Sequence, residues 1–312
     1  MSLAFVFPGQ GAQTIGMGKD LAEAYPAAKA VFDEVDDALG EKLSAVIWEG
    51  EQDRLTLTEN AQPALMATSM AAMRALEAEG VDVTAAAYVA GHSLGEYSAL
   101  CAAGAFSVAD AARLLRVRGL AMQSAVPVGE GAMAAILGLS VEDVEKLVSA
   151  AAGGEVCQVA NENDPMQNVV SGSTAAVERA VELAKEAGAK RALMLPVSAP
   201  FHCELMRPAA VEMERALGEV EIRDPKVPVV ANVRAEGVSD AATIRTLLIE
   251  QVAGRVRWKS SVEWMASAGV TEFWEVGAGK ALSGMIRRIA KDAGTRAVGS
   301  AVDVAEAAAS MR

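Results

Sequence analysis

AAYVAGHSLGEY, residues 86–97, places a short apolar run directly before a glycine-flanked serine and the start of a helical pattern. In α/β proteins a G-x-S-x-G turn joins a strand to a helix, and its small residues let the two elements approach while the serine hydroxyl stands clear of the backbone. The start of the helix supplies unpaired N–H groups and a partial positive charge for an oxyanion. We therefore predict that Ser93 is a nucleophile. A purely structural glycine-rich turn is the alternative.

Strand and helix signals alternate along most of the chain. The run LAFVF at 3–7 is typical of a buried strand, and apolar residues recur at helical spacing over 61–79. Ser107 opens a further helix with a capping pattern. This alternation predicts an α/β fold, in which helices cover the mostly parallel sheet of a hydrolase-like large domain.

The pattern changes between residues 128 and 198. Strand, helix, strand, strand, helix and strand signals follow one another there, with a turn predicted at 161–165 between the second and third strands. The order β-α-β-β-α-β is that of split, ferredoxin-like domains. We predict an inserted ferredoxin-like subdomain over 128–198, and a large domain made of 1–127 and 199–312.

Composition excludes several classes of protein. The chain of 312 residues has a formal net charge of −13, which argues against general nucleic-acid binding. No apolar run approaches the roughly 20 residues that span a bilayer, and the first residues carry no signal-peptide pattern. The three cysteines lack disulfide or metal-ligand spacing. We expect a cytoplasmic protein that binds neither membrane nor nucleic acid and holds no metal.

A nucleophilic serine needs a base, and the chain has only two histidines. His92 adjoins Ser93 and should point away from it at the elbow. His202 lies in SAPFHCE, where the predicted insert rejoins the large domain, so we predict that His202 is the base. Cys203 beside it is interpreted as a packing residue, because nothing nearby would lower the pKa of its thiol.

An oxyanion hole needs two donors. One is the main-chain N–H of Leu94, which follows the nucleophile. The loop FPGQGAQ at 7–13 could supply the second around Gln10, since Gly9 and Gly11 allow close approach. A tight glycine turn without this role is the alternative.

Arg118 lies on the apolar side of the helix predicted after Ser107 and should therefore face inward. A buried guanidinium requires an anion, because an unpaired inward charge costs several kcal/mol. The anion is either an internal carboxylate or the carboxylate of a substrate. The sequence identifies no acidic residue that would complete a Ser-His-Asp triad by orienting the imidazole. A backbone or amide oxygen could orient it instead.

Seven motifs occur in a fixed order along essentially the whole chain. They are FPGQGAQ (7–13), QPAL (62–65), GHSLGEY (91–97), RGLAMQ (118–123), ANENDPMQNVVSG (160–172), PFH (200–202) and QVAGRVRW (251–258). Together they resemble the malonyl-CoA:acyl-carrier-protein transacylases of fatty-acid synthesis and the related acyltransferase domains of polyketide synthases.

The resemblance implies that Ser93 is acylated, that His202 acts as base and then as acid, and that Arg118 anchors the malonyl carboxylate. It assigns the oxyanion hole to Gln10 and Leu94, and the orientation of the imidazole to the main-chain carbonyl of Gln251. Asn161 and Asn163 match asparagines that border the cleft. Asn163 and Phe201 are expected to bind substrate with Arg118, and Phe201 is expected to favour malonyl groups. Met166 departs from the family, where glycine often follows the proline, and this puts the shape of one cleft wall in doubt.

The implied function is transfer of a malonyl group from malonyl-CoA to the phosphopantetheine thiol of an acyl carrier protein, through a malonyl-serine and without a cofactor. We expect a monomer. Carrier proteins are typically acidic, so we predict docking on basic residues at Arg287 and Arg288, near Lys291, with Lys190 and Arg191 adding charge. The alternatives are a serine thioesterase or esterase, the transacylase subunit of malonate decarboxylase, and an inactive relative that only binds acyl carriers.

Overall fold

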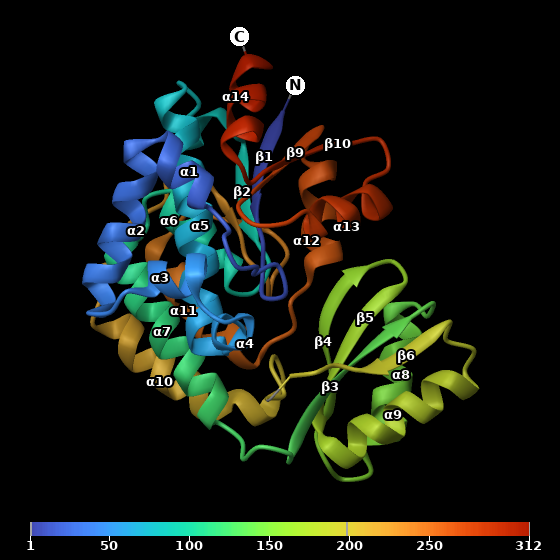
Figure 1. Ribbon diagram of the computed structural model, residues 1–312. Coiled ribbons are helices and arrows are strands. Elements are labelled where there is room, and N and C mark those ends of the chain that lie inside the picture. The colour runs from blue at the N-terminus through green and yellow to red at the C-terminus, as the bar shows by residue number, and fades with distance from the viewer. Residues whose placement is uncertain (1, 198, 312) are drawn as a thin grey trace.

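The computed structural model describes residues 2–197 and 199–311, which form two sheets with helices packed around them (Figure 1). The first sheet contains β1 (Leu3–Phe7), β2 (Tyr88–Gly91), β7 (Val229–Val230), β8 (Gly237–Val238), β9 (Glu272–Val276) and β10 (Gly294–Val298). The second contains β3 (Gly131–Leu137), β4 (Cys157–Asp164), β5 (Gln167–Ser173) and β6 (Arg191–Met194).

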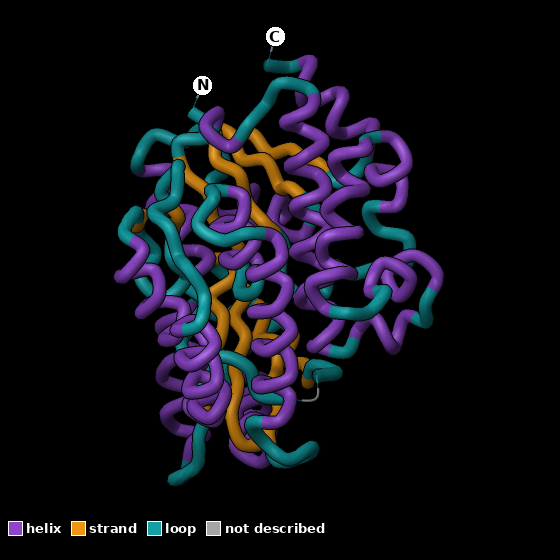
Figure 2. The backbone as a smooth tube through the Cα atoms, turned by 90° about the vertical axis from the view of Figure 1, so that its left-hand side faces the viewer, coloured by secondary structure: helices purple, strands orange, loops and turns teal. Residues whose placement is uncertain are grey.

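The helices follow the alternation that the sequence predicts. Those around the first sheet are α1 (Lys19–Ala24), α2 (Pro26–Leu39), α3 (Leu43–Glu49), α4 (Gln52–Thr56), α5 (Thr58–Ala78), α6 (Gly95–Ala102), α7 (Val108–Ser124), α10 (Arg207–Gly218), α11 (Ala241–Ala253), α12 (Trp258–Ser267), α13 (Ala281–Ile289) and α14 (Ala301–Ala309). Short 3-10 turns lie at η1 (Val83–Ala85) and η2 (Glu204–Met206), and α8 (Val141–Ala152) and α9 (Thr174–Glu186) pack on the second sheet. Figure 2 shows helices on both sides of the strands.

The first sheet has the strand order β10-β9-β1-β2-β7-β8 and is parallel except at the β7–β8 pair. The prediction of an α/β fold with a mostly parallel sheet is confirmed. In the register of β1 and β2, Phe7 lies opposite Gly91. Both strands therefore end side by side, and the loops that follow them leave the same edge of the sheet, where α/β proteins place their sites.

The second sheet is antiparallel, with the order β4-β5-β3-β6. Its elements follow one another as β3, α8, β4, β5, α9 and β6, which confirms the predicted β-α-β-β-α-β order. Its apolar core is formed by the facing sides of the sheet and the two helices, and it is separate from the core of the first sheet.

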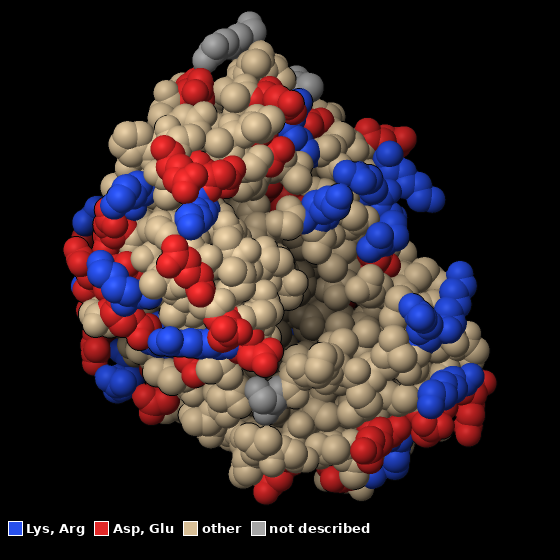
Figure 3. Space-filling model, viewed as in Figure 1, with Lys and Arg blue, Asp and Glu red and all other residues tan. Residues whose placement is uncertain are grey.

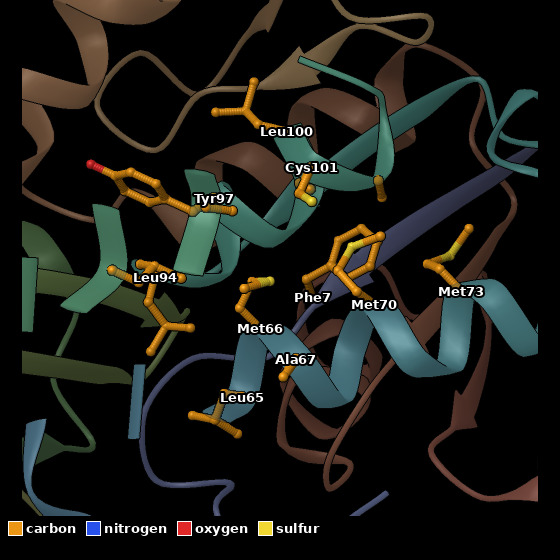
Figure 4. Packing of buried hydrophobic residues seen from close by; sticks show 14 of the residues in the cluster. Phe7, Leu65, Met66, Ala67, Met70, Met73, Leu94, Tyr97, Leu100 and Cys101 are labelled. Atoms are coloured by element: carbon orange, nitrogen blue, oxygen red, sulfur yellow. The ribbon is translucent and has the colours of Figure 1, made fainter. Parts of the chain in front are cut away.

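The main core surrounds α5, a helix that is buried over most of its length and packs against both α2 and α7. Figure 4 shows Met66, Met70 and Met73 of α5 facing Phe7 of β1 and residues of α6. Because α6 is buried over its whole length, it is held from all sides, and the elbow that precedes it is held with it.

The predicted turn at 161–165 is wrong in position, because β4 continues through Asp164. Asn161 pairs with Val256 in an isolated parallel β-bridge, and the Glu162 N–H donates to the Val256 carbonyl at 2.9 Å. This long-range pairing keeps a polar segment extended.

The part of the chain that the structure describes contains no helix long and apolar enough to cross a membrane.

Candidate active site

Ser93 lies in the turn between β2 and α6 and has a φ angle of 54°. Non-glycine residues rarely adopt this left-handed conformation, and it is typical of strained functional positions. The flanking residues Gly91 and Gly95 must be glycine, because neighbouring backbone atoms leave no room for a side chain. A Cβ on Gly91 would overlap the Gly95 carbonyl, and a Cβ on Gly95 would overlap the Phe7 carbonyl. The local sequence thus forces the strand and the helix together and raises the serine between them.

His202 is brought to Ser93 from 109 residues away, with its Nε2 2.7 Å from the Ser93 Oγ. It lies in a left-handed backbone conformation, with a φ angle of 57°, and is 4% exposed. On the other side of the ring, Nδ1 lies 3.0 Å from the Gln251 carbonyl and 3.1 Å from the Gly254 carbonyl. Because both neighbours accept hydrogen bonds, Nδ1 carries the proton, and the lone pair of Nε2 faces the serine.

Burial and the nearby positive charge of Arg118 lower the pKa of His202 to about 3. The imidazole is therefore neutral at physiological pH and able to take a proton. Two main-chain carbonyls orient it, in the position that a carboxylate holds in Ser-His-Asp sites.

Arg118 of α7 is 1% exposed, as the inward position on its helix predicts. Its Nη1 donates to the Gln62 Oε1 at 2.8 Å, and its Nη2 donates to the Gln251 Oε1 at 2.9 Å and to the Ser93 Oγ at 3.1 Å. Within the described residues it forms no ion pair, and its Nε has no hydrogen-bond partner. Of the two anions considered from the sequence, no internal carboxylate contacts the guanidinium directly.

Gln10 and Leu94 lie on the neighbouring loops that follow β1 and β2. The loops touch, since a Cβ on Gly9 would overlap the carbonyl of His92. Within the described residues, the main-chain N–H groups of Gln10 and Leu94 have no hydrogen-bond acceptor. Both residues line the cleft beside Ser93, so two free donors lie next to the elbow.

The cleft beside Ser93 has a volume of about 310 Å³ and is lined by both parts of the chain. Gln10, Gln62, Arg118 and His202 contribute polar groups, and Met122, Phe201 and, from β3, Met133 contribute apolar surface. Figure 3 shows a hollow in the surface where the two parts meet.

The two asparagines of the predicted site have different places. Asn161 lines the cleft. The Oδ1 of Asn163 lies 2.8 Å from the Nε2 of His92, whose ring packs beside the indole of Trp258. Asn163 is not among the described residues that line the cleft. Met166 lies in the turn after β4, is 48% exposed and is not among the residues that line the cleft.

Arg287 and Arg288 are not brought into the cleft. Both are exposed on α13, where Arg287 donates to Thr295 and the Nε of Arg288 lies 2.6 Å from the Asp164 Oδ2. Figure 3 shows Lys and Arg side chains gathered on the side of the molecule that carries α13.

Cys203 is buried, and its Sγ donates to the Pro200 carbonyl at 3.1 Å. Burial raises the pKa of its thiol, so a packing role fits it. Among the described residues, no group of three His, Cys, Asp or Glu side chains could hold a metal ion.

Sequence reasoning missed three polar residues that complete the site. Gln62 holds Arg118, and Asn232 accepts from the Ser93 N–H at 2.8 Å. Glu96 is 2% exposed and accepts from the Gln251 Nε2 at 2.8 Å. Gln62 and Glu96 stand inside the motifs QPAL and GHSLGEY, which was a usable signal. Asn232 had none.

Comparison with known proteins identifies the family. The model of the acyl transferase domain matches residues 4–246. The malonyl CoA-acyl carrier protein transacylase of Bacillus subtilis is 50% identical over 297 residues, which cover 95% of this chain and 93% of that protein. The corresponding protein of Escherichia coli K12 is 48% identical and covers 92% of each chain.

Solved structures agree. An acyl-carrier-protein S-malonyltransferase from Bartonella henselae superposes with a TM-score of 0.98 at 55% identity, over 100% of this chain and 99% of that one. A malonyl-transacylase in complex with a type II polyketide synthase acyl-carrier protein superposes with a TM-score of 0.96 at 41% identity, over 99% and 100%. The chain therefore belongs to the acyl transferase domain family and, within it, to the malonyl CoA-acyl carrier protein transacylases.

Proposed function

We propose that this chain transfers the malonyl group of malonyl-CoA to the phosphopantetheine thiol of an acyl carrier protein, with Ser93 carrying the malonyl group between the two. One observation carries the proposal. The buried guanidinium of Arg118 has no ion-pair partner among the described residues. It lies 3.1 Å from the Ser93 Oγ, which the His202 Nε2 contacts at 2.7 Å. The cleft thus combines a nucleophile with a receptor for a carboxylate.

In the first half-reaction, the His202 Nε2 takes the proton of Ser93 as the Oγ attacks the thioester carbonyl carbon. The new C–O bond forms, and the carbonyl oxygen becomes an oxyanion that the N–H groups of Gln10 and Leu94 stabilise. The C–S bond then breaks, and the imidazolium returns its proton to the coenzyme A thiolate. The product is a malonyl-serine ester.

The second half-reaction reverses the roles. The thiol of the carrier's phosphopantetheine arm gives its proton to the His202 Nε2 and attacks the ester carbonyl. The bond to the Ser93 Oγ breaks, and the imidazolium returns the proton to that oxygen. The main-chain carbonyls of Gln251 and Gly254 stabilise the imidazolium in both steps. The sequence of steps requires no cofactor.

Arg118 selects the substrate by its charge. A malonyl carboxylate would form charge-assisted hydrogen bonds with the guanidinium, whereas an acetyl group would leave the buried charge uncompensated. Phe201 narrows the same cleft and is proposed to favour malonyl over methylmalonyl groups.

The acidic carrier protein is proposed to dock at Arg287 and Arg288 of α13. Both side chains are exposed and positive on a chain whose formal net charge is −13, which supports their selection. Arg288 already contacts Asp164, so Arg287 is the freer of the two charges to meet the carrier.

The domain boundaries are retained as part of the proposal, with a large domain over 1–127 and 199–312 and an inserted subdomain over 128–198. The separate apolar cores support this division. Residues 1, 198 and 312, which end these segments, lie outside the described residues. We also propose that the protein is a monomer in the cytoplasm. The three buried free thiols fit a reducing compartment.

Steady-state kinetics with both substrates test the function. Coenzyme A release should depend on phosphopantetheinylated carrier protein, and initial rates at several carrier concentrations should give the parallel double-reciprocal lines of a double-displacement mechanism. Ser93→Ala should abolish transfer, whereas Ser98→Ala, at a buried serine of α6 outside the cleft, should leave it intact. Rapid release of free malonate without any carrier would instead indicate a thioesterase.

A further inference from the structure

The side chain of Gln251 joins the groups on which the proposed reaction depends. Its Oε1 accepts from the Arg118 Nη2 at 2.9 Å. Its Nε2 donates to the Ser93 carbonyl at 2.9 Å, and its main-chain carbonyl accepts from the His202 Nδ1 at 3.0 Å. One residue of α11 therefore contacts the carboxylate receptor, the elbow and the base.

The amide of Gln251 functions in only one of its two orientations. The oxygen must face Arg118, because a guanidinium has only donors. On the other side lie three acceptors: the Ser93 carbonyl, the Glu96 Oε2 at 2.8 Å and the Asn232 Oδ1 at 3.4 Å. A flipped amide would turn its N–H groups toward Arg118 and its oxygen toward these acceptors, so it would displace the guanidinium.

Glu96 dominates the acceptor side. Its contact with Gln251 is the shortest of the three, and the same Oε2 accepts from the Asn232 main-chain N–H at 3.1 Å. Asn232 in turn accepts from the Ser93 N–H through its Oδ1, and its Nδ2 donates to the Gly91 carbonyl at 2.7 Å. The carboxylate thus holds two of the groups that surround the elbow.

We propose that Glu96 is a positioning residue, whose Oε2 holds the Gln251 amide in the orientation that presents Arg118 to the carboxylate of the acyl group. Glu96 touches no reacting atom and acts through Gln251. Burial raises the pKa of Glu96 to about 7. Its function does not depend on the charge, because a carboxyl group protonated at Oε1 still accepts at Oε2.

Two conservative substitutions separate the position of the acceptor from its charge. Glu96→Gln keeps an oxygen where Oε2 lies and removes the charge. Glu96→Asp keeps the charge and withdraws the oxygen by one methylene. The matched control is Glu275→Asp, because Glu275 of β9 is also fully buried and accepts from two N–H groups, those of Leu282 and Ser283, at the start of α13.

The measured quantity is the ratio of acyl-serine formation rates from malonyl-CoA and acetyl-CoA, read by quenched intact mass on folded protein. Glu96→Gln should keep this ratio within about threefold of the wild type, and Glu96→Asp should lower it at least tenfold. Glu275→Asp should leave it unchanged, whatever it does to the melting temperature.

A merely structural role for Glu96 predicts that Glu96→Asp lowers both rates by the same factor, and that result would overturn the proposal. Wild-type rates in Glu96→Asp would overturn the proposal as well. So would a collapsed ratio in Glu96→Gln, because that result would assign the effect to the charge of Glu96. The inference rests on the proposed function, but the two fail differently. If the function is wrong, the wild type forms no malonyl-serine. If only the inference is wrong, the wild type forms it, and the Glu96 variants give one of the contradicting results named above.

Discussion

Replacing Arg118 by alanine should convert a malonyl-selective enzyme into one that barely distinguishes malonyl from acetyl groups. The guanidinium is 1% exposed and is held by Gln62 and Gln251, with no carboxylate in contact among the described residues. Its charge is therefore available to a substrate, and its removal leaves a pocket without a positive charge to bind a carboxylate.

The size of the effect follows from the lost interaction. A hydrogen bond to a charged group contributes roughly 1.5–3 kcal/mol, and a factor of ten corresponds to about 1.4 kcal/mol. The value of kcat/KM for malonyl-CoA should therefore fall roughly 10- to 150-fold. The value for acetyl-CoA should stay level or rise, because an uncompensated buried charge no longer opposes that substrate.

The assay is the rate of acyl-serine formation from each thioester, measured by quenched-flow intact mass. Arg113→Ala is the matched control, since Arg113 lies on the same helix but is exposed and paired with Asp110. An unchanged malonyl-to-acetyl preference in Arg118→Ala would refute the reasoning, as would an equal loss for both substrates.

Three further predictions concern the elbow, the buried acid and the docking surface. Gly91→Ala should lower the free energy of unfolding by about 2 kcal/mol or more, because its Cβ would overlap the Gly95 carbonyl; urea denaturation measures this, and a wild-type midpoint would contradict it. The folded-state pKa of Glu96 is about 7 and its ordinary value is 4.5, so its contribution to stability is lost as pH rises from 4.5 through 7. The free energy of unfolding of Glu96→Gln minus that of the wild type should therefore be larger at pH 8 than at pH 5, by at most about 3 kcal/mol. The same difference at both pH values would exclude this pKa shift. Arg287→Glu should raise the KM for carrier protein severalfold and leave the KM for malonyl-CoA unchanged; equal changes in both constants would count against docking on α13.

The parts of the site that rest on local pattern could be predicted from the sequence. The strand, the glycines and the helix start of the elbow are adjacent in the chain, and helical spacing alone is enough to turn Arg118 inward. His202 was reached by elimination, because only two histidines exist.

The parts that rest on distant contacts could not be predicted. An acid in the first turn of a helix is ordinarily solvated beside the helix N-terminus, and Glu96 is buried only because Asn232 and Gln251, 136 and 155 residues away, supply its donors. The same limit explains the misplaced turn at 161–165. Nothing local indicates that Val256 pairs with that segment and keeps it extended.

The central claim is that Ser93 carries a malonyl group between two thiols. Intact mass after incubation with malonyl-CoA alone tests it most directly, followed by peptide mapping and by addition of phosphopantetheinylated carrier protein. The account predicts a single malonyl adduct on the peptide that contains Ser93, none in Ser93→Ala, and loss of the adduct only when the carrier is added and becomes malonylated. An adduct at another residue, or none in the wild type while the carrier is still malonylated, would contradict it.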